Sequence, residues 1–345
     1  MKSYFSIPFL LLFSSLFFVQ NNPDFKVGWC VYSFEAHSQR HLDMIQKCKP
    51  SIIRWFMEWD RHDVIKNGQS LRKQRLEAYK PFFELCAKQN ITLVVQIWVK
   101  DRLWAGDGDG GTQWAKPDKF TNYPANIQQS YGTFVRELVD IMNLCGVPDK
   151  NIILEAWNEP DLLWGIPNTN PPNYHEPWKV FSKKGFSKWT GGSGQKWQEL
   201  HTVLGDTHKD IRWANGSVGI HERYSSWIAP AYNIPQITVL DLHYYLWSTK
   251  TAQEYCDSVS RIIERWDKYL PAGKKPYPFF IGECAKFSSG NEENMIVRKE
   301  HAQMMREACT ILSQKYKERF LGMTAHAPVK MWEKGIAWFD EKYTY

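Results

Sequence analysis

Two glutamates that lie far apart in the sequence each follow a short apolar run. Glu159 stands between Asn158 and Pro160, shortly after an Ile-Ile-Leu run, and Glu283 ends the run Phe-Phe-Ile-Gly. Pro160 fixes its own φ and lacks an N–H group, so a strand that approaches it must end there. In α/β sheets and barrels, chemistry is carried by residues at the carboxyl ends of strands. We therefore expect the two carboxyl groups to lie in one cleft.

Two carboxyl groups that face each other across a cleft are the machinery of glycoside hydrolysis. A separation of about 5–5.5 Å allows one group to attack the anomeric carbon, whereas about 6.5–9.5 Å leaves room for a water molecule and inverts the configuration. The two pKa values must also differ, because one group donates a proton while the other stays ionised. The pair therefore predicts cleavage of glycosidic bonds if the fold brings Glu159 and Glu283 together.

The elements that would position these residues alternate along the chain. Short apolar runs predict eight strands, at residues 26–32, 51–56, 92–98, 151–156, 212–216, 237–242, 279–282 and 322–325. Apolar residues at helical spacing predict helices at 41–47, 71–89, 126–144, 195–209, 252–269 and 291–317. Nearly continuous apolar strands are typical of parallel sheets covered on both faces. The alternation predicts an α/β fold, a single-domain (β/α)8 TIM barrel.

Three segments depart from a minimal barrel. Residues 100–124 include a Gly-Asp-Gly-Asp-Gly-Gly run, which a glycine-rich loop explains better than a calcium site because later oxygen ligands are missing. Residues 162–194 hold several aromatic residues beside Glu159, which suits a wall of a sugar-binding groove. Residues 327–345 show no clear helix, so we expect the last barrel helix to be atypical or missing.

The motif Trp-Asn158-Glu159-Pro, with Ile-Gly-Glu283 downstream, resembles the clan A glycoside hydrolases, which are retaining (β/α)8 enzymes. The resemblance covers most of the chain in strand order, and its closest branches are cellulase/mannanase-like or xylosidase/iduronidase-like. It implies that Glu159 is the acid/base and Glu283 the nucleophile. It also implies that Asn158 binds the 2-hydroxyl of the sugar at the cleavage point, a contact that strengthens in the transition state.

The resemblance implies further substrate-site positions at strand ends. Arg54, on the second strand, matches the arginine that orients the nucleophile, although a purely structural salt bridge is the alternative. An isolated buried cation is costly, so a buried Arg54 requires a carboxylate partner. His243 and Tyr245 share one face of the sixth strand, and Tyr245 is the candidate for a contact with the nucleophile. Glu155 is interpreted as a buried structural carboxylate rather than a third catalytic group.

Two tryptophans are weaker candidates for sugar contacts. Trp98 ends the third strand, where core packing is an equal alternative to a sugar subsite. Trp332 is the nearest candidate for the aromatic platform that many clan members have on strand eight, but it lies some way past that strand. The seventeen Trp residues of the chain serve either the core or a cleft lined with flat rings.

Two other classes of function compete with a glycosidase. A catalytically inactive carbohydrate-binding barrel would use the same cleft, but it would not need both Glu159 and Glu283. A barrel enzyme for phosphorylated metabolites would need a glycine-rich phosphate loop after strands seven and eight, and residues 283–290 match it poorly. The sequence leaves the sugar and the linkage open, and the long aromatic loops favour cutting within a chain. Neither leading alternative requires a metal or a cofactor.

The N-terminal segment and the overall charge indicate where the protein works. Residues 1–20 have the basic start and apolar run of a signal peptide, so we expect a secreted or extracytoplasmic protein with the catalytic domain at 24–345. Phe17, Phe18 and Val19 are bulky for a cleavage site, which keeps an uncleaved membrane anchor open. A net charge of +6 without basic clusters argues against nucleic acid as a partner. We expect a monomer whose partner is a carbohydrate.

Overall fold

The structure is a computed structural model of the chain. It describes residues 26–32, 36–59, 65–66, 69–70, 76–99, 125–155, 204, 207–214, 237–245, 251–268, 275–284 and 294–325. The expected signal peptide at 1–20, the two long loops at 100–124 and 162–194, and the segment 327–345 all lie outside these residues.

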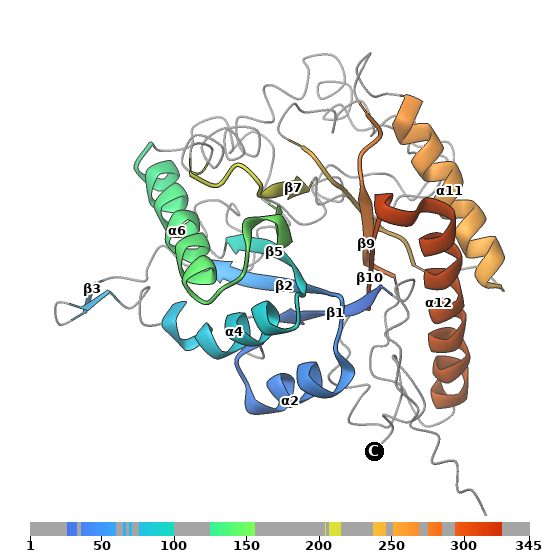
Figure 1. Cartoon of the computed structure of the whole chain (residues 1–345), viewed down its shortest axis with the longest axis horizontal. Helices are drawn as coiled ribbons and strands as arrows, with labels where there is room; N and C mark the ends of the chain where they lie inside the picture. Colours follow the sequence, from blue (N-terminus) through green and yellow to red (C-terminus); the bar gives the residue numbers. More distant parts are fainter. Residues whose placement is uncertain are drawn as a thin grey trace, which may run out of the picture.

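Within the described residues, eight parallel strands form one sheet in chain order (Figure 1). All eight strands predicted from the sequence are confirmed, with ends shifted by a few residues. They are β1 (Val27–Tyr32), β2 (Ile52–Trp59), β5 (Thr92–Val99), β6 (Ile152–Glu155), β7 (Arg212–Ala214), β8 (Leu240–His243), β9 (Phe279–Glu283) and β10 (Phe320–Ala325).

Two contacts close this sheet into a barrel. The last strand, β10, pairs in parallel with β1, where Val27 is opposite Met323. Between β7 and β8, Ala214 forms a parallel bridge with Val239, and the amide of Val239 donates to the carbonyl of Trp213 at 3.0 Å. The predicted (β/α)8 barrel is therefore confirmed, and all strand carboxyl ends meet at one mouth.

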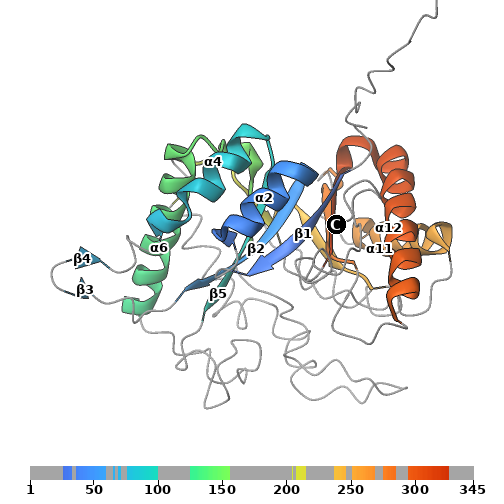
Figure 2. The ribbon, with the colours of Figure 1, turned by 90° about the horizontal axis from the view of Figure 1, so that it is seen from below.

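Helices lie outside the strands, as Figures 1 and 2 show from two directions. They are α2 (Gln39–Cys48), α4 (Lys80–Lys88), α6 (Ala125–Leu144), α11 (Ala252–Lys268) and α12 (Asn294–Tyr316). Each overlaps a helix predicted from the sequence, whereas the helix predicted at 195–209 lies mostly outside the described residues. None of the helices in the described ranges is long and apolar enough to cross a membrane.

The sequence did not predict a small antiparallel pair between β2 and α4. Its strands are β3 (Ile65–Lys66) and β4 (Gln69–Ser70). Two-residue strands are too short to show a hydrophobic period of two, so no sequence pattern marks them. Two short 3₁₀ helices, η3 (Asp149–Asn151) and η7 (Lys317–Arg319), lead directly into β6 and β10.

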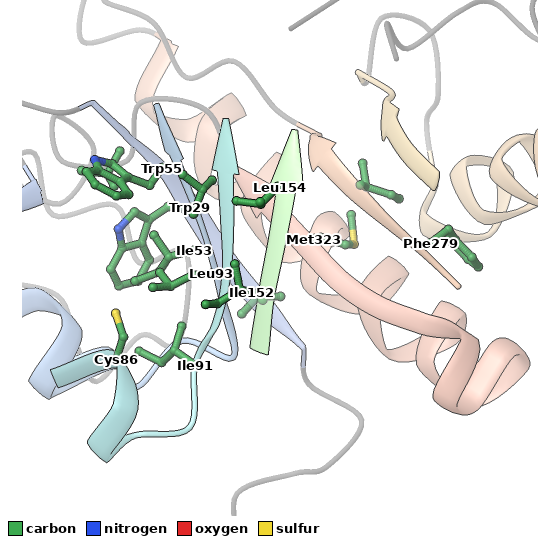
Figure 3. Close-up of a cluster of buried hydrophobic side chains, with 14 of the residues drawn as sticks. Trp29, Ile53, Trp55, Cys86, Ile91, Leu93, Ile152, Leu154, Phe279 and Met323 are labelled. Atoms are coloured by element: carbon green, nitrogen blue, oxygen red, sulfur yellow. The ribbon is translucent and has the colours of Figure 1, made fainter. Parts of the chain in front are cut away.

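The main hydrophobic core lies between the strands and the helices (Figure 3). Trp55 projects from β2 into this layer, where its ring centroid lies 5.7 Å from that of Phe82 and 5.5 Å from that of Phe83 on α4. Trp29 is likewise fully buried, and its indole N–H donates to His41 on α2 at 2.8 Å. For Trp29 and Trp55, the core-filling alternative is therefore the correct one.

A second, smaller apolar cluster lies inside the barrel. Its six members come from neighbouring strands and are Ile52, Val94, Ile153, Ala214, Val239 and Phe280. Two residues further toward the carboxyl ends of β2, β6 and β8, the same inward positions carry Arg54, Glu155 and Asp241, all fully buried. The barrel interior thus consists of an apolar floor with a charged layer above it, directly below the mouth.

Close strand packing at the base of the barrel makes a testable prediction. A side chain added at Gly28 would place its Cβ 1.5 Å from the backbone carbonyl oxygen of Ile52, so β1 would have to move. We expect Gly28→Ala to lower the free energy of unfolding by about 3 kcal/mol or more, measured by urea denaturation. The control Ser51→Ala removes only a 3.3 Å hydrogen bond to Val27 and should cost about 1 kcal/mol. An unchanged urea midpoint in Gly28→Ala would contradict this packing.

Candidate active site

Glu283 is the last residue of β9 and lies just below the barrel mouth. Its Oε1 atom accepts a hydrogen bond from Nη1 of Arg54 at 2.8 Å, and its Oε2 atom accepts one from the hydroxyl of Tyr245. Nδ1 of His243 lies 3.8 Å from Oε1. Glu283 is only 5% exposed, and both of its carboxylate oxygens accept hydrogen bonds.

Arg54 links Glu283 to two further carboxyl groups. Its guanidinium is fully buried, its Nε and Nη2 atoms each lie 2.9 Å from Oε2 of Glu155, and Nη2 lies 3.7 Å from Oδ2 of Asp241. Burial opposes the positive charge, but Glu155, Asp241 and Glu283 outweigh it and hold the pKa of Arg54 well above its usual range. One cation on β2 thus joins acids from β6, β8 and β9.

Asp241, on β8, binds both His243 and the backbone beside Glu283. Its Oδ2 atom lies 2.9 Å from Nε2 of His243, and its Oδ1 atom accepts the backbone N–H of Gly282 at 2.9 Å. Burial works against both charges. Nevertheless, contact with Asp241 and then Glu283 raises the pKa of His243 well above its ordinary value, while His243 and Arg54 lower the pKa of Asp241. Both acids favour the charged form of His243, which would place a second positive charge beside Glu283.

Gly282 is required at this point by the approach of Asp241. A Cβ atom at position 282 would lie 2.2 Å from Oδ1 of Asp241, so a larger residue would break the hydrogen bond to the amide. The carbonyl of Gly282 accepts hydrogen bonds from the hydroxyl of Thr324 and, at 3.2 Å, from the thiol of Cys30. The backbone next to Glu283 is therefore held by β1, β8 and β10 together.

The thiol that follows Glu283 does not compete with it as a nucleophile. Cys284 is fully buried and donates to the carbonyl of Thr324 at 3.2 Å. Burial raises its pKa well above the usual value, so the reactive thiolate is scarce. All seven cysteines lie within the described residues, and all are free thiols.

Four of the residues predicted for the site are brought together by the structure. Arg54, His243, Tyr245 and Glu283 form one contact cluster, and Arg54 has the carboxylate partners that its burial demands. Glu155 is fully buried against Arg54, as expected for a structural carboxylate. The roles assigned to these residues in a reaction stay predictions.

The other predicted positions lie beyond what the structure describes. Asn158, Glu159 and Trp332 are outside the described residues, and of Trp98 only the backbone, within β5, is described. Sequence reasoning missed Asp241 as a member of the cluster. It shares the inward face of its strand with His243, and that spacing of two could have identified it.

Comparison with known proteins agrees with the fold. No protein-family model and no curated protein matches the sequence. A GH5-4 broad specificity endoglucanase from an uncultured bacterium superimposes with a TM-score of 0.60 at 13% identity, over 90% of each chain. The hyperthermostable endo-1,4-β-D-mannanase from Thermotoga petrophila RKU-1 gives 0.51 at 13% identity, over 87% of each chain. PbGH5A, a family 5 enzyme from Prevotella bryantii B14, gives 0.53 at 10% identity, over 85% of this chain and 82% of that one.

The chain has a (β/α)8 fold, which it shares with these three enzymes. At identities of 10–13%, the likeness shows the fold alone. The (β/α)8 barrel supports many chemistries, so the activity depends on the residues of the site, here Arg54, Glu283 and the sequence around them.

The buried charge of Arg54 makes the second prediction. We expect Arg54→Met to lower the free energy of unfolding at pH 7 by about 3–5 kcal/mol, because it leaves the buried carboxylates of Asp241 and Glu283 without their cation. The loss should shrink as the pH falls from 7 toward about 4, because buried carboxyl groups without a cation take up protons in the folded variant at a higher pH than in the unfolded chain. Urea denaturation across this pH range measures both effects.

Arg319→Met is the matched control. Arg319 forms a two-pronged ion pair with Asp267 but is about one-fifth exposed, so its loss should cost at most about 1–2 kcal/mol. If Arg54→Met were no more damaging than Arg319→Met, the charged layer would not be held together by Arg54.

Proposed function

We propose that this protein is a retaining glycoside hydrolase that cleaves a β-linked oligo- or polysaccharide by double displacement. Glu283 is the nucleophile, and Glu159 is the acid/base. The observation that carries the proposal is the environment of Glu283, whose two oxygens accept from Arg54 and Tyr245 at the carboxyl end of the seventh barrel strand. Hydrogen bonds to the charged form and a nearby cation both favour an ionised carboxylate, which is the form that attacks.

The position of Glu155 supports a role for Glu159 opposite Glu283. Arg54 contacts Glu155 at the end of β6 and Glu283 at the end of β9 with the same guanidinium, so these two strand ends face each other across the barrel. Glu159 follows Glu155 by four positions. In our proposal the chain beyond Glu155 carries Glu159 to the mouth, with Asn158 on the 2-hydroxyl of the sugar.

The reaction proceeds in two steps under this proposal. Glu283 attacks the anomeric carbon while Glu159 protonates the leaving oxygen, which gives a glycosyl ester and a free alcohol. Glu159 then removes a proton from water, the water attacks the anomeric carbon, and Glu283 leaves as a carboxylate. Arg54, Tyr245 and His243 stabilise the negative charge of Glu283 before attack and after release.

The substrate class rests on sequence features and on the neighbours. Two of the structural neighbours are described as an endoglucanase and an endo-1,4-β-D-mannanase, which supports a β-linked polysaccharide as the substrate. The aromatic residues in 162–194, together with Trp98 and Trp332, would bind sugar rings in a groove that permits cutting within a chain. Export through residues 1–20 would bring the enzyme to an extracytoplasmic polysaccharide.

Two substitutions separate the two carboxyl roles. Glu283→Gln should lower kcat by about 10³-fold or more on every substrate, because covalent catalysis is lost. Glu159→Ala should slow substrates with poor leaving groups far more than activated aryl glycosides, which leave without a proton. The measurement is kcat and KM on β-glucan, mannan and xylan and on the corresponding aryl β-glycosides.

Glu254→Gln on the exposed start of α11 is the control, with wild-type rates expected. Wild-type-like turnover by Glu283→Gln would exclude Glu283 as the nucleophile. Equal losses on both substrate types in Glu159→Ala would exclude the acid role of Glu159. Binding of a polysaccharide without turnover by the wild type would favour a carbohydrate-binding barrel instead.

A further inference from the structure

Among the residues that the structure describes, the charged layer contains more acids than bases. The Arg54 cluster, defined as Arg54, Glu155, Asp241, His243 and Glu283, holds three carboxyl groups against two basic groups. The side chains of Arg54, Glu155, Asp241 and His243 have no exposure, and that of Glu283 has 6%. If all five groups were ionised, one negative charge would be buried without compensation, which is strongly disfavoured.

The contacts of Glu155 indicate how this excess charge is removed. Arg54 directs both Nε and Nη2 to a single oxygen, Oε2, each at 2.9 Å. The other oxygen, Oε1, is buried and has no hydrogen-bond donor among the residues that the structure describes. An ionised carboxylate beside a guanidinium usually accepts one N–H on each oxygen. A neutral carboxylic acid accounts for the asymmetry, with Oε2 as its carbonyl oxygen and Oε1 as its hydroxyl.

Glu155 and Asp241 lie against the same nitrogen of Arg54, which also favours a proton on one of them. Nη2 of Arg54 is 2.9 Å from Oε2 of Glu155 and 3.7 Å from Oδ2 of Asp241, and two ionised carboxylates held this close would repel each other. Asp241 already accepts the amide of Gly282 and lies against His243 and Arg54, so Asp241 is the ionised member. We propose that Glu155 is a neutral carboxylic acid in the folded protein at neutral pH, beside an ionised Asp241.

The electrostatic environment of each group agrees with this assignment. Burial and the neighbouring Asp241 raise the pKa of Glu155 well above its usual value, although Arg54 and His243 oppose the shift. On β8 the pKa of Asp241 is lowered, despite burial, by His243 and Arg54. Within the described part of the chain, the remaining titratable groups at the cluster are Glu283 on β9, Tyr245 just after β8, and the thiol of Cys30 on β1, whose pKa burial raises.

The proton on Glu155 leaves Arg54 and His243 to balance only Asp241 and Glu283. If Glu155 were ionised, it would take the greater share of the guanidinium charge and leave Glu283 less well compensated. Glu155 therefore acts as a positioning residue that reserves positive charge for Glu283. This role rests on the proposed function, whereas the protonation of Glu155 does not.

The test is the pH dependence of stability in Glu155→Gln, since Gln copies the shape of a neutral acid and keeps an oxygen for Arg54. In the unfolded chain Glu155 ionises above about pH 4.3, while in the folded protein it keeps its proton. Wild-type stability therefore loses a contribution as the pH rises above that value, and Glu155→Gln does not. We expect the urea midpoint of Glu155→Gln, relative to wild type, to rise steadily from pH 5 to pH 8.

The opposite slope would overturn the proposal. If Glu155 were an ionised partner of Arg54, its folded pKa would be depressed, and Glu155→Gln would lose stability relative to wild type as the pH rises. Asp241→Asn is the matched control, because it removes the ionised member of the pair. It should lower the urea midpoint at pH 7 by more than Glu155→Gln does, and equal losses would also contradict the proposal.

Infrared spectroscopy provides a second readout if Glu155→Gln does not fold. In a Glu159→Gln background, which removes the proposed acid/base, the folded protein at pH 7 should still show the C=O stretch of a protonated carboxylic acid. Absence of this band would overturn the proposal. Neither readout needs a substrate, so failure of the proposed function, seen as turnover by Glu283→Gln, is distinguishable from failure of this inference.

Discussion

The guanidinium of Arg54 is fully buried, and a buried guanidinium is stable only if acids surround it. The barrel must therefore place carboxyl groups around Arg54. Arg54 draws carboxyl groups from β6, β8 and β9 into one layer, with Glu155, Asp241 and Glu283 all within 4 Å of its nitrogens. The barrel provides what this arrangement needs, because its strands are parallel and all carboxyl ends meet at the mouth. The apolar floor below excludes water, so each ion pair in the layer is strong.

The same contacts that stabilise the cluster also fix the orientation of the Glu283 side chain. Asp241 accepts the backbone N–H of Gly282, the residue before Glu283, and the hydroxyl of Thr324 donates to the carbonyl of Gly282. Arg54 and Tyr245 donate to the two carboxylate oxygens of Glu283. The pairing of β8 with β9 also shifts register between Leu242 and His243, at the level of Glu283. A side chain fixed by backbone and side-chain contacts from several strands loses little freedom on reaching a substrate.

The eight strands could be predicted because both faces of a barrel strand are covered, which makes each strand a short apolar run. The need of Arg54 for a carboxylate partner could also be predicted, since burial of a lone cation is costly. The spacing of two from His243 marks Asp241 as inward-facing, but its contacts with Gly282 and Arg54 could not be predicted, because these residues come from other strands. The proton on Glu155 depends on the count of charges around it, which only the assembled cluster reveals.

Trp29 and Trp55 show another limit of sequence reasoning. Both point outward into the layer between strands and helices, where they pack on His41 and on the rings of α4. Aromatic content alone does not tell core from cleft, because the two uses need the same residue types. The distinction depends on which face of a strand each ring occupies, and a short apolar run does not mark its faces.

Covalent trapping tests most directly whether this cluster serves a nucleophile. The protein would be incubated with activated 2-deoxy-2-fluoro β-glycosides of glucose, mannose and xylose, digested, and analysed by peptide mass spectrometry. One of these sugars should form a stable ester on Glu283, with no adduct in Glu283→Gln. An adduct on a different residue, or turnover of the natural linkage with inversion of configuration, would contradict the account.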